Sequence, residues 1–213
     1  FLEVSSEFLM GRRPYEVTSP ATSSEAWKQN RVSDKVTGHS MGGYGHQYFE
    51  MYGIYLRPLR DLPIRMFEIG LGCGMRYGAG SSVNLWKDYF RHPNFTLFVA
   101  DFNRTCLQEK YQKNLSSQQI LNHLNIHLPS GDQGDPQTVA RWGRETAGSF
   151  DVVIDDGSHD SDHQFTSFQG LCPHVVPGGL YFIEDISISA KLVEIIKAWI
   201  HQLTLYRVPI YGH

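Results

Sequence analysis

The chain has few cysteines and no long apolar segment. Its three cysteines, Cys73, Cys106 and Cys172, are an odd number at unrelated spacings. This argues against a disulfide framework and against a zinc site, and it makes a reducing, cytoplasmic compartment the default expectation. No apolar run approaches the roughly 18 residues that a membrane-spanning helix needs, so we expect no membrane span.

Clusters of basic residues are also missing. The chain carries 19 Lys and Arg against 22 Asp and Glu, and it has no basic block, so it lacks the electrostatic footprint of a nucleic-acid-binding protein. A small polar molecule is the better partner. Three N-x-S/T sequons, at Asn94, Asn103 and Asn114, keep a secretory-lumen location open as an alternative. The sequence leaves open whether the chain forms a homo-oligomer.

Two regions differ in pattern. Residues 1–62 form a polar N-terminal arm that ends in an amphipathic helix at residues 46–59, and residues 63–213 alternate apolar strands with helices. Such alternation predicts an α/β fold with a Rossmann-like, mostly parallel sheet covered by helices on both faces. We expect strands at 65–69, 96–100, 124–128, 150–154 and 180–183, a turn at 177–179, and helices at 81–90, 105–115, 136–146, 162–171 and 190–203.

The first strand ends in alternating glycines. Glu68, Gly70, Gly72 and Gly74 form an acidic-x-Gly-x-Gly-x-Gly run, which differs in spacing from the dinucleotide fingerprint G-x-G-x-x-G. Glycine lets the backbone approach a cofactor closely, because no side chain stands in the way. Strand-to-helix turns also use glycine for packing alone, and both interpretations stay open here.

Acids follow the second and third strands. Asp101 ends the second strand, where Rossmann-like folds place a carboxylate on the ribose hydroxyls of a nucleotide. Asp132 and Gln133 follow the third. Each acid could instead be an ordinary strand-end or turn residue.

The fourth and fifth strands also end in acids. Asp155, Asp156 and His159 follow one strand, and Glu184 and Asp185 close the next. Carboxylates that converge at one sheet edge repel one another unless a cation lies among them, and oxygen donors suit Mg²⁺. The alternative is that these acids are solvated loop residues.

The glycine run resembles motif I of class I S-adenosylmethionine (SAM)-dependent methyltransferases. The segments 151–159 (DVVIDDGSH), 183–185 (IED), 86–90 (WKDYF) and 131–135 (GDQGD) resemble the metal-dependent sugar O-methyltransferases of macrolide biosynthesis, over about residues 33–185. The resemblance implies SAM and Mg²⁺ (or Mn²⁺) as cofactors. It implies Asp156 and Asp185 as metal ligands, His159 as the catalytic base, and a cofactor site made by Glu68, Gly70, Gly72, Gly74, Asp101, Asp132, Gln133 and Asp155.

The implied activity is Mg²⁺-assisted O-methylation of a sugar-like or other vicinal-diol acceptor in a natural product or glycan. A nicotinamide-dependent oxidoreductase and a non-catalytic interaction module are the alternatives. The stretch containing Lys35, Tyr48 and Tyr52 resembles the segment that covers SAM in the family. Only 28 residues follow Asp185, so we expect the C-terminal hairpin and acceptor lid either to be incomplete or to be reduced.

Overall fold

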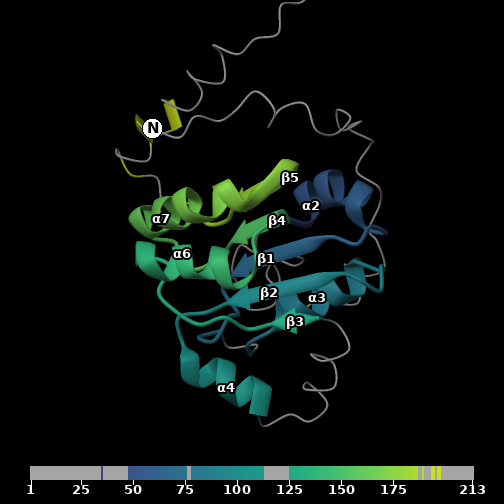
Figure 1. The fold of residues 1–213 in the computed structure, drawn as a ribbon, viewed down its shortest axis with the longest axis horizontal. Helices are drawn as coiled ribbons and strands as arrows, with labels where there is room; N and C mark the ends of the chain where they lie inside the picture. Colours follow the sequence, from purple (N-terminus) through teal and green to yellow (C-terminus); the bar gives the residue numbers. More distant parts are fainter. Residues whose placement is uncertain are drawn as a thin grey trace, which may run out of the picture.

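A computed structural model describes residues 35, 48–75, 78–112, 125–186, 189, 193–194 and 196–197. Strands and helices alternate along these residues (Figure 1). In chain order the elements are α2 (Tyr48–Leu56), the 3-10 helix η2 (Arg57–Leu59), β1 (Arg65–Ile69), α3 (Ser81–Tyr89), β2 (Thr96–Ala100), α4 (Arg104–Gln112), β3 (Ile126–His127), α6 (Pro136–Glu145), β4 (Phe150–Asp155), α7 (Ser161–Leu171), the 3-10 helix η3 (Cys172–His174) and β5 (Val175–Ile183).

The five strands form one parallel sheet in the order β3-β2-β1-β4-β5. The central strand β1 pairs with β2 on one side and with β4 on the other. Strands β2 and β3 extend the sheet on one side of β1, and β4 and β5 extend it on the other side, so the topological switch point lies between β1 and β4. Open α/β sheets bind ligands at such a switch point, outside the carboxyl ends of the strands. The glycine run and the acids after β4 therefore meet where a ligand is expected.

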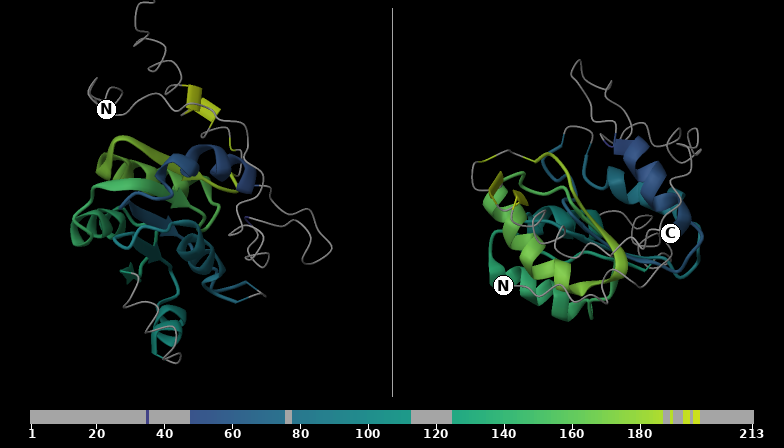
Figure 2. Two further views of the ribbon diagram at one scale, coloured as in Figure 1. Left: turned by 90° about the vertical axis from the view of Figure 1, so that its right-hand side faces the viewer. Right: turned by 90° about the horizontal axis from the view of Figure 1, so that it is seen from above.

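Helices cover both faces of the sheet, and each face has its own apolar core. Tyr52 of α2 and Trp86 of α3 pack into one core. Trp142 of α6 and Leu171 of α7 pack into the other. The right-hand view of Figure 2 shows α6 and α7 on one side of the strands and α2 on the other. The predicted α/β architecture, a parallel sheet with helices on both faces, is confirmed.

Most predicted elements lie where the sequence placed them. The first two strands match residue for residue, and Asp135 caps α6 by accepting hydrogen bonds from the backbone N–H groups of Gln137 and Thr138. The predicted third strand shrinks to two residues. The C-terminal helix predicted at 190–203 lies largely outside the described residues, and the boundary between residues 62 and 63 stays a prediction.

The turn predicted at residues 177–179 is wrong. These residues lie inside β5, which begins at Val175 rather than at Leu180. Phe150 pairs with Val175 and Val152 pairs with Leu180, so the segment between them bulges out of register. A bulge absorbs the Pro-Gly-Gly segment without ending the strand, because Gly178 takes the left-handed conformation with φ of 76°.

No helix among the described residues is both long enough and apolar enough to cross a bilayer.

Candidate active site

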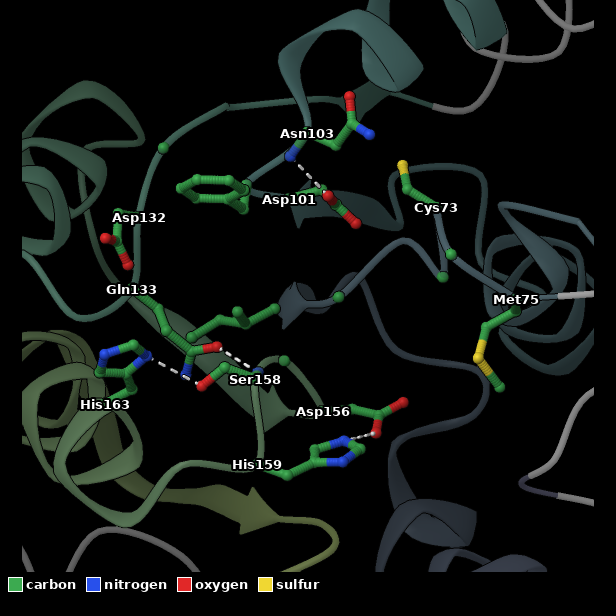
Figure 3. Close-up of a pocket in the computed structure, with 17 residues that line it drawn as sticks. Cys73, Met75, Asp101, Asn103, Asp132, Gln133, Asp156, Ser158, His159 and His163 are labelled. Carbon is green, nitrogen blue, oxygen red and sulfur yellow. Dashed lines mark hydrogen bonds and ion pairs between the residues drawn. The ribbon is translucent and has the colours of Figure 1, made fainter.

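A cavity of about 600 Å³ opens at the switch point (Figure 3). Its volume lies within the range of roughly 300–1,000 Å³ that is usual for small-molecule and cofactor sites. The loops after β1, β2, β3 and β4 all contribute to its wall, through Ile69, Gly70, Gly72, Cys73, Gly74, Met75, Asp101, Phe102, Asn103, Gly131, Asp132, Gln133, Asp156, Gly157, Ser158, His159 and His163.

The glycines of the loop after β1 serve two different purposes. Gly70 has φ of 105°, and a Cβ atom added there would lie 2.1 Å from the backbone oxygen of Asp156. This glycine is required for packing the β1 loop against the β4 loop. Gly74 has no such constraint, because a Cβ atom there would meet nothing within 4 Å. Its backbone is open to the cavity, as cofactor binding requires.

A disulfide joins this loop to α4. Cys73 bonds to Cys106, with their Cα atoms 6.0 Å apart. The expectation that the cysteines form no disulfide is therefore wrong. The fold brings the loop after β1 and the start of α4 to the same edge of the sheet, and a separation of 33 residues in the sequence does not reveal this. Cys172 is a free thiol.

Asp101 lines the cavity and also supports it. Its Oδ2 atom accepts a hydrogen bond from the backbone N–H of Leu71 at 3.0 Å, and its Oδ1 accepts one from the N–H of Asn103 at 2.8 Å. The carboxylate thus joins the glycine loop to the β2 loop. Each oxygen has a second lone-pair direction, so it can accept a further bond from a ligand.

Asp132 and Gln133 both reach the cavity wall. Asp132 caps its own turn by accepting a hydrogen bond from the N–H of Gly134 at 2.8 Å. Gln133 is almost fully buried, accepts from the N–H of Ser158 at 2.7 Å and donates to Asp155 at 3.0 Å. Gln133 therefore shapes the loop after β4, in addition to facing the cavity.

Two residues that we expected to touch the cofactor lie beneath the cavity instead. Glu68 is fully buried and accepts hydrogen bonds from Ser82 at 2.8 Å and from the indole of Trp86 at 3.0 Å. Asp155 is also fully buried and accepts from Ser167. Burial raises the pKa of Glu68 to about 7 and that of Asp155 to about 6. Neither residue lines the cavity, because both side chains turn into the protein.

Asp156, His159 and Asp185 come together at the edge of the cavity. One ligand atom from each lies within 4.8 Å of the others. The Nε2 atom of His159 is 3.3 Å from Asp156 Oδ1 and 3.7 Å from Asp185 Oδ2. Two carboxylates that leave room for waters fit the coordination habits of Mg²⁺. The donor set is therefore chemically suited to this ion.

Neighbouring charges and hydrogen bonds favour the ionised form of the Asp156 carboxylate and the protonated form of the His159 imidazole. Burial alone would raise the pKa of Asp156, but hydrogen bonding from His159 and the nearby ammonium of Lys35 lower it below its usual value. The hydrogen bond to Asp156 raises the pKa of His159, and the charge of Asp185 adds to this effect. The pair therefore holds an ionised carboxylate beside a basic imidazole.

Both His159 and Asp185 have a strained backbone, with φ of 59° and 47°. Residues other than glycine seldom adopt this left-handed region, and each instance costs of order 1–3 kcal/mol. Strain of this kind persists only where surrounding contacts enforce it.

Three side chains from the N-terminal part of the chain contact the acids that follow β4 and β5. Lys35 is fully buried and lies 2.5 Å from Asp156 and 3.0 Å from Glu184. Tyr52 donates to Glu184, and Tyr48 donates to Asp185 at 2.6 Å. None of the three lines the cavity. These residues contact the acids, and the expectation that the N-terminal segment covers the cofactor stays a prediction.

Phe102 lines the cavity and was missed by the sequence reasoning. This aromatic residue directly follows Asp101 and is 76% exposed. The only signal in the sequence is its position after a strand-end acid.

No family model matches the chain. The mycinamicin VI 2''-O-methyltransferase of Micromonospora griseorubida is 36% identical to it over 146 residues, which is 68% of this chain and 32% of that protein. The L-olivosyl-oleandolide 3-O-methyltransferase of Streptomyces antibioticus is 32% identical over 177 residues, or 83% of this chain and 42% of the relative. The chain is a homologue of the macrolide and sugar O-methyltransferases.

Solved structures agree with these homologues. The mycinamycin-pathway methyltransferase MycE, solved in complex with Mg and SAH, superposes with a TM-score of 0.65 at 27% identity, covering 86% of this chain and 47% of MycE. A second MycE structure, which also contains mycinamycin VI, gives a TM-score of 0.64 at 28% identity. The chain spans about a third to two fifths of the length of the curated homologues quoted above, and just under half of MycE.

Proposed function

We propose that the chain is a SAM-dependent, Mg²⁺-assisted O-methyltransferase acting on a hydroxyl of a sugar-like or other vicinal-diol acceptor. The observation that carries the proposal is the meeting of Asp156, His159 and Asp185 at the edge of the glycine-loop cavity. A cofactor cavity beside a general base and two possible metal ligands supplies what metal-assisted methyl transfer to a hydroxyl uses.

The proposal that SAM is the cofactor is supported by the residues that line the cavity opposite His159. Figure 3 shows Asp101 and Asn103 on one side of the cavity and the Asp156–His159 pair on the other. The open backbone at Gly74, the acceptor oxygens of Asp101 and the exposed ring of Phe102 suit a nucleoside with a ribose diol and a flat base. The homologue MycE was solved with SAH, the demethylated product of SAM.

The metal half rests on chemistry that an aliphatic hydroxyl needs. Its pKa lies far above neutrality, and a bound cation would stabilise the alkoxide as the proton leaves. Asp156 and Asp185 would hold the ion, and the neutral imidazole of His159 would accept the hydroxyl proton. The same residues would orient the acceptor oxygen toward the methyl group, and such positioning lowers the barrier by several kcal/mol.

The names of the homologues support the proposed acceptor class. The two quoted relatives are named as a 2''-O-methyltransferase of mycinamicin VI and a 3-O-methyltransferase of L-olivosyl-oleandolide. A third, from Streptomyces olivaceus, is named as a 2'-O-methyltransferase of an 8-demethyl-8-alpha-L-rhamnosyl tetracenomycin-C. These names favour a glycosylated natural product or a glycan as the acceptor, over a protein or a nucleic acid. The shared methyl-transfer chemistry of these relatives also disfavours the oxidoreductase alternative.

The compartment belongs to this proposal as well. The cytoplasmic default rested on the absence of a disulfide, and Cys73–Cys106 removes that support. Disulfides persist mainly in oxidising compartments, so the alternative of a secretory lumen gains weight. Mapping of thiols in protein from its native cell tests this: two free thiols at Cys73 and Cys106 would favour the cytoplasm, and a cross-linked peptide would favour the lumen.

The experiment that tests the function is methyl transfer from labelled SAM to a panel of glycosides. Transfer should cease with EDTA and return with Mg²⁺ or Mn²⁺, while calorimetry shows that SAM still binds. His159→Ala should slow transfer by roughly 10²–10⁴-fold and leave SAM affinity unchanged. Full activity in excess EDTA would contradict the metal-assisted mechanism, and failure of SAM to bind would contradict the whole proposal.

A further inference from the structure

Tyr48 of α2 contacts the loop after β5 across a separation of 137 residues. Its hydroxyl donates to Asp185 Oδ1 at 2.6 Å and accepts a hydrogen bond from the backbone N–H of Asp185 at 3.1 Å. One hydroxyl therefore holds both the side chain and the backbone of a single residue. Because Tyr48 does not line the cavity, this contact acts on Asp185 rather than on a ligand there.

Asp185 is one of the two residues with a left-handed backbone among Asp156, His159 and Asp185; the other is His159. Asp185 has φ of 47°, a conformation that its surroundings must enforce. The two-point contact with Tyr48 restrains both the side chain and the backbone of this residue. It also separates the two carboxylate oxygens, because Oδ1 faces Tyr48 while Oδ2 lies 3.7 Å from His159.

Asp156 shows the same division. Its Oδ2 faces the buried ammonium of Lys35 at 2.5 Å, and its Oδ1 lies 3.3 Å from His159. In each of the two carboxylates, one oxygen contacts a residue of the N-terminal segment, Lys35 or Tyr48, and the other oxygen lies near His159. The repetition at two separate strand ends indicates an arrangement that orients the pair.

We propose that Tyr48 is a positioning residue that fixes the Asp185 carboxylate for divalent-cation binding. Hydrogen bonds behind a ligand orient it, and their loss typically weakens metal affinity about 10–100-fold. Tyr48 is neutral, so its hydroxyl can be removed without changing the charge of the site. The inference rests on the proposed metal-dependent function and extends it to a residue outside the ligand set.

The test is a titration of the full chain with Mn²⁺. The electron paramagnetic resonance signal of free Mn²⁺ measures how much of the ion stays unbound at each step. Tyr48→Phe keeps the aromatic ring, which makes an edge-on contact with Tyr52, and removes only the hydroxyl. Tyr55→Phe is the matched control, because Tyr55 is on the same helix, is 40% exposed and contacts Phe182 through its ring. We expect Mn²⁺ affinity to fall about 10–100-fold in Tyr48→Phe and to stay unchanged in Tyr55→Phe.

SAM affinity and melting temperature separate positioning from a general structural role. Positioning predicts that both stay close to the wild-type values in Tyr48→Phe while Mn²⁺ affinity drops. Wild-type Mn²⁺ affinity in Tyr48→Phe would overturn the inference and leave the proposed function intact. A wild-type chain that binds no Mn²⁺ would overturn the metal-dependent function, and the positioning role with it.

Discussion

Some side chains at the carboxyl edge of the sheet hydrogen-bond to a neighbouring loop and also face the cavity. Asp101 accepts one backbone N–H on each oxygen and still faces the cavity. Gln133 supports the loop at Ser158 and reaches the same cavity. Substituting such residues removes a ligand contact and a loop support together, so a test needs a variant that separates the two.

Asp101→Ala removes both acceptor oxygens, and we expect a loss of about 1–3 kcal/mol in SAM binding because no neighbour replaces charge-assisted hydrogen bonds. Asp101→Asn is the matched variant. It keeps one carbonyl oxygen, which can accept from the N–H of Leu71 or of Asn103 but not from both, so it retains part of the loop support and part of the ribose contact. Calorimetry should rank SAM affinity as wild type, then Asn, then Ala. Equal affinity in all three proteins would show that Asp101 only supports the loop.

The sequence predicts which acids end the strands, but it does not predict where their side chains turn. Asp155 and Asp156 are adjacent, and β4 sends the first into the core while the second reaches the cavity. Glu68 lies in an apolar strand, and its buried carboxylate is held by hydrogen bonds from Ser82 and Trp86 of α3. Side-chain direction at a strand end depends on these packed neighbours, which are distant in the sequence.

Among the helices and loops, the connection of the glycine loop to α4 is the least expected feature. The sequence predicts the strands, most helices and the Asp135 cap, because their signals are local: alternating apolar residues, a capping acid and a proline at the first helical turn. The disulfide and the β5 bulge escape prediction. Each depends on how two separate elements meet across the sheet.

Reducing the Cys73–Cys106 disulfide should destabilise the chain. The cross-link closes a 33-residue separation, and the loss of this constraint on the unfolded state corresponds to about 3–4 kcal/mol. The double variant Cys73→Ser/Cys106→Ser should unfold at lower urea concentration, and dithiothreitol should have the same effect on the wild type. Cys172→Ser is the control, because that thiol is free. A wild-type transition that is insensitive to dithiothreitol would argue against a stabilising cross-link.

For the chain as a unit, the unusual feature is a group of buried acids around one buried cation. Lys35 lies 3.8 Å from Glu68, besides its contacts with Asp156 and Glu184. Burial raises the pKa of Glu68 to about 7 and that of Glu184 to about 8, although Lys35 opposes both shifts. Several acids therefore stay protonated in the folded chain at a pH where the unfolded chain has already lost those protons.

This difference sets the direction of the pH dependence of folding. An unfolded glutamate titrates near its ordinary pKa of about 4.3, whereas folded Glu68 titrates at about 7. Between these values the folded state binds more protons than the unfolded state, so the free energy of unfolding falls as pH rises. Glu68 alone contributes a decrease of up to about 4 kcal/mol over that window, because the two pKa values differ by just under three units and each unit is worth about 1.4 kcal/mol.

Glu68→Gln removes this titration while keeping hydrogen-bonding capacity. The amide oxygen can still accept from Trp86, and Ser82 can accept from the amide N–H in place of donating. In EDTA without SAM, the decline in melting temperature from pH 4.5 to 7 should therefore be smaller in Glu68→Gln than in the wild type. Glu145→Gln, which changes an exposed glutamate on α6, should keep the wild-type slope. Parallel curves for wild type and Glu68→Gln would mean that the buried carboxyl is already ionised throughout this range, stabilised by Lys35.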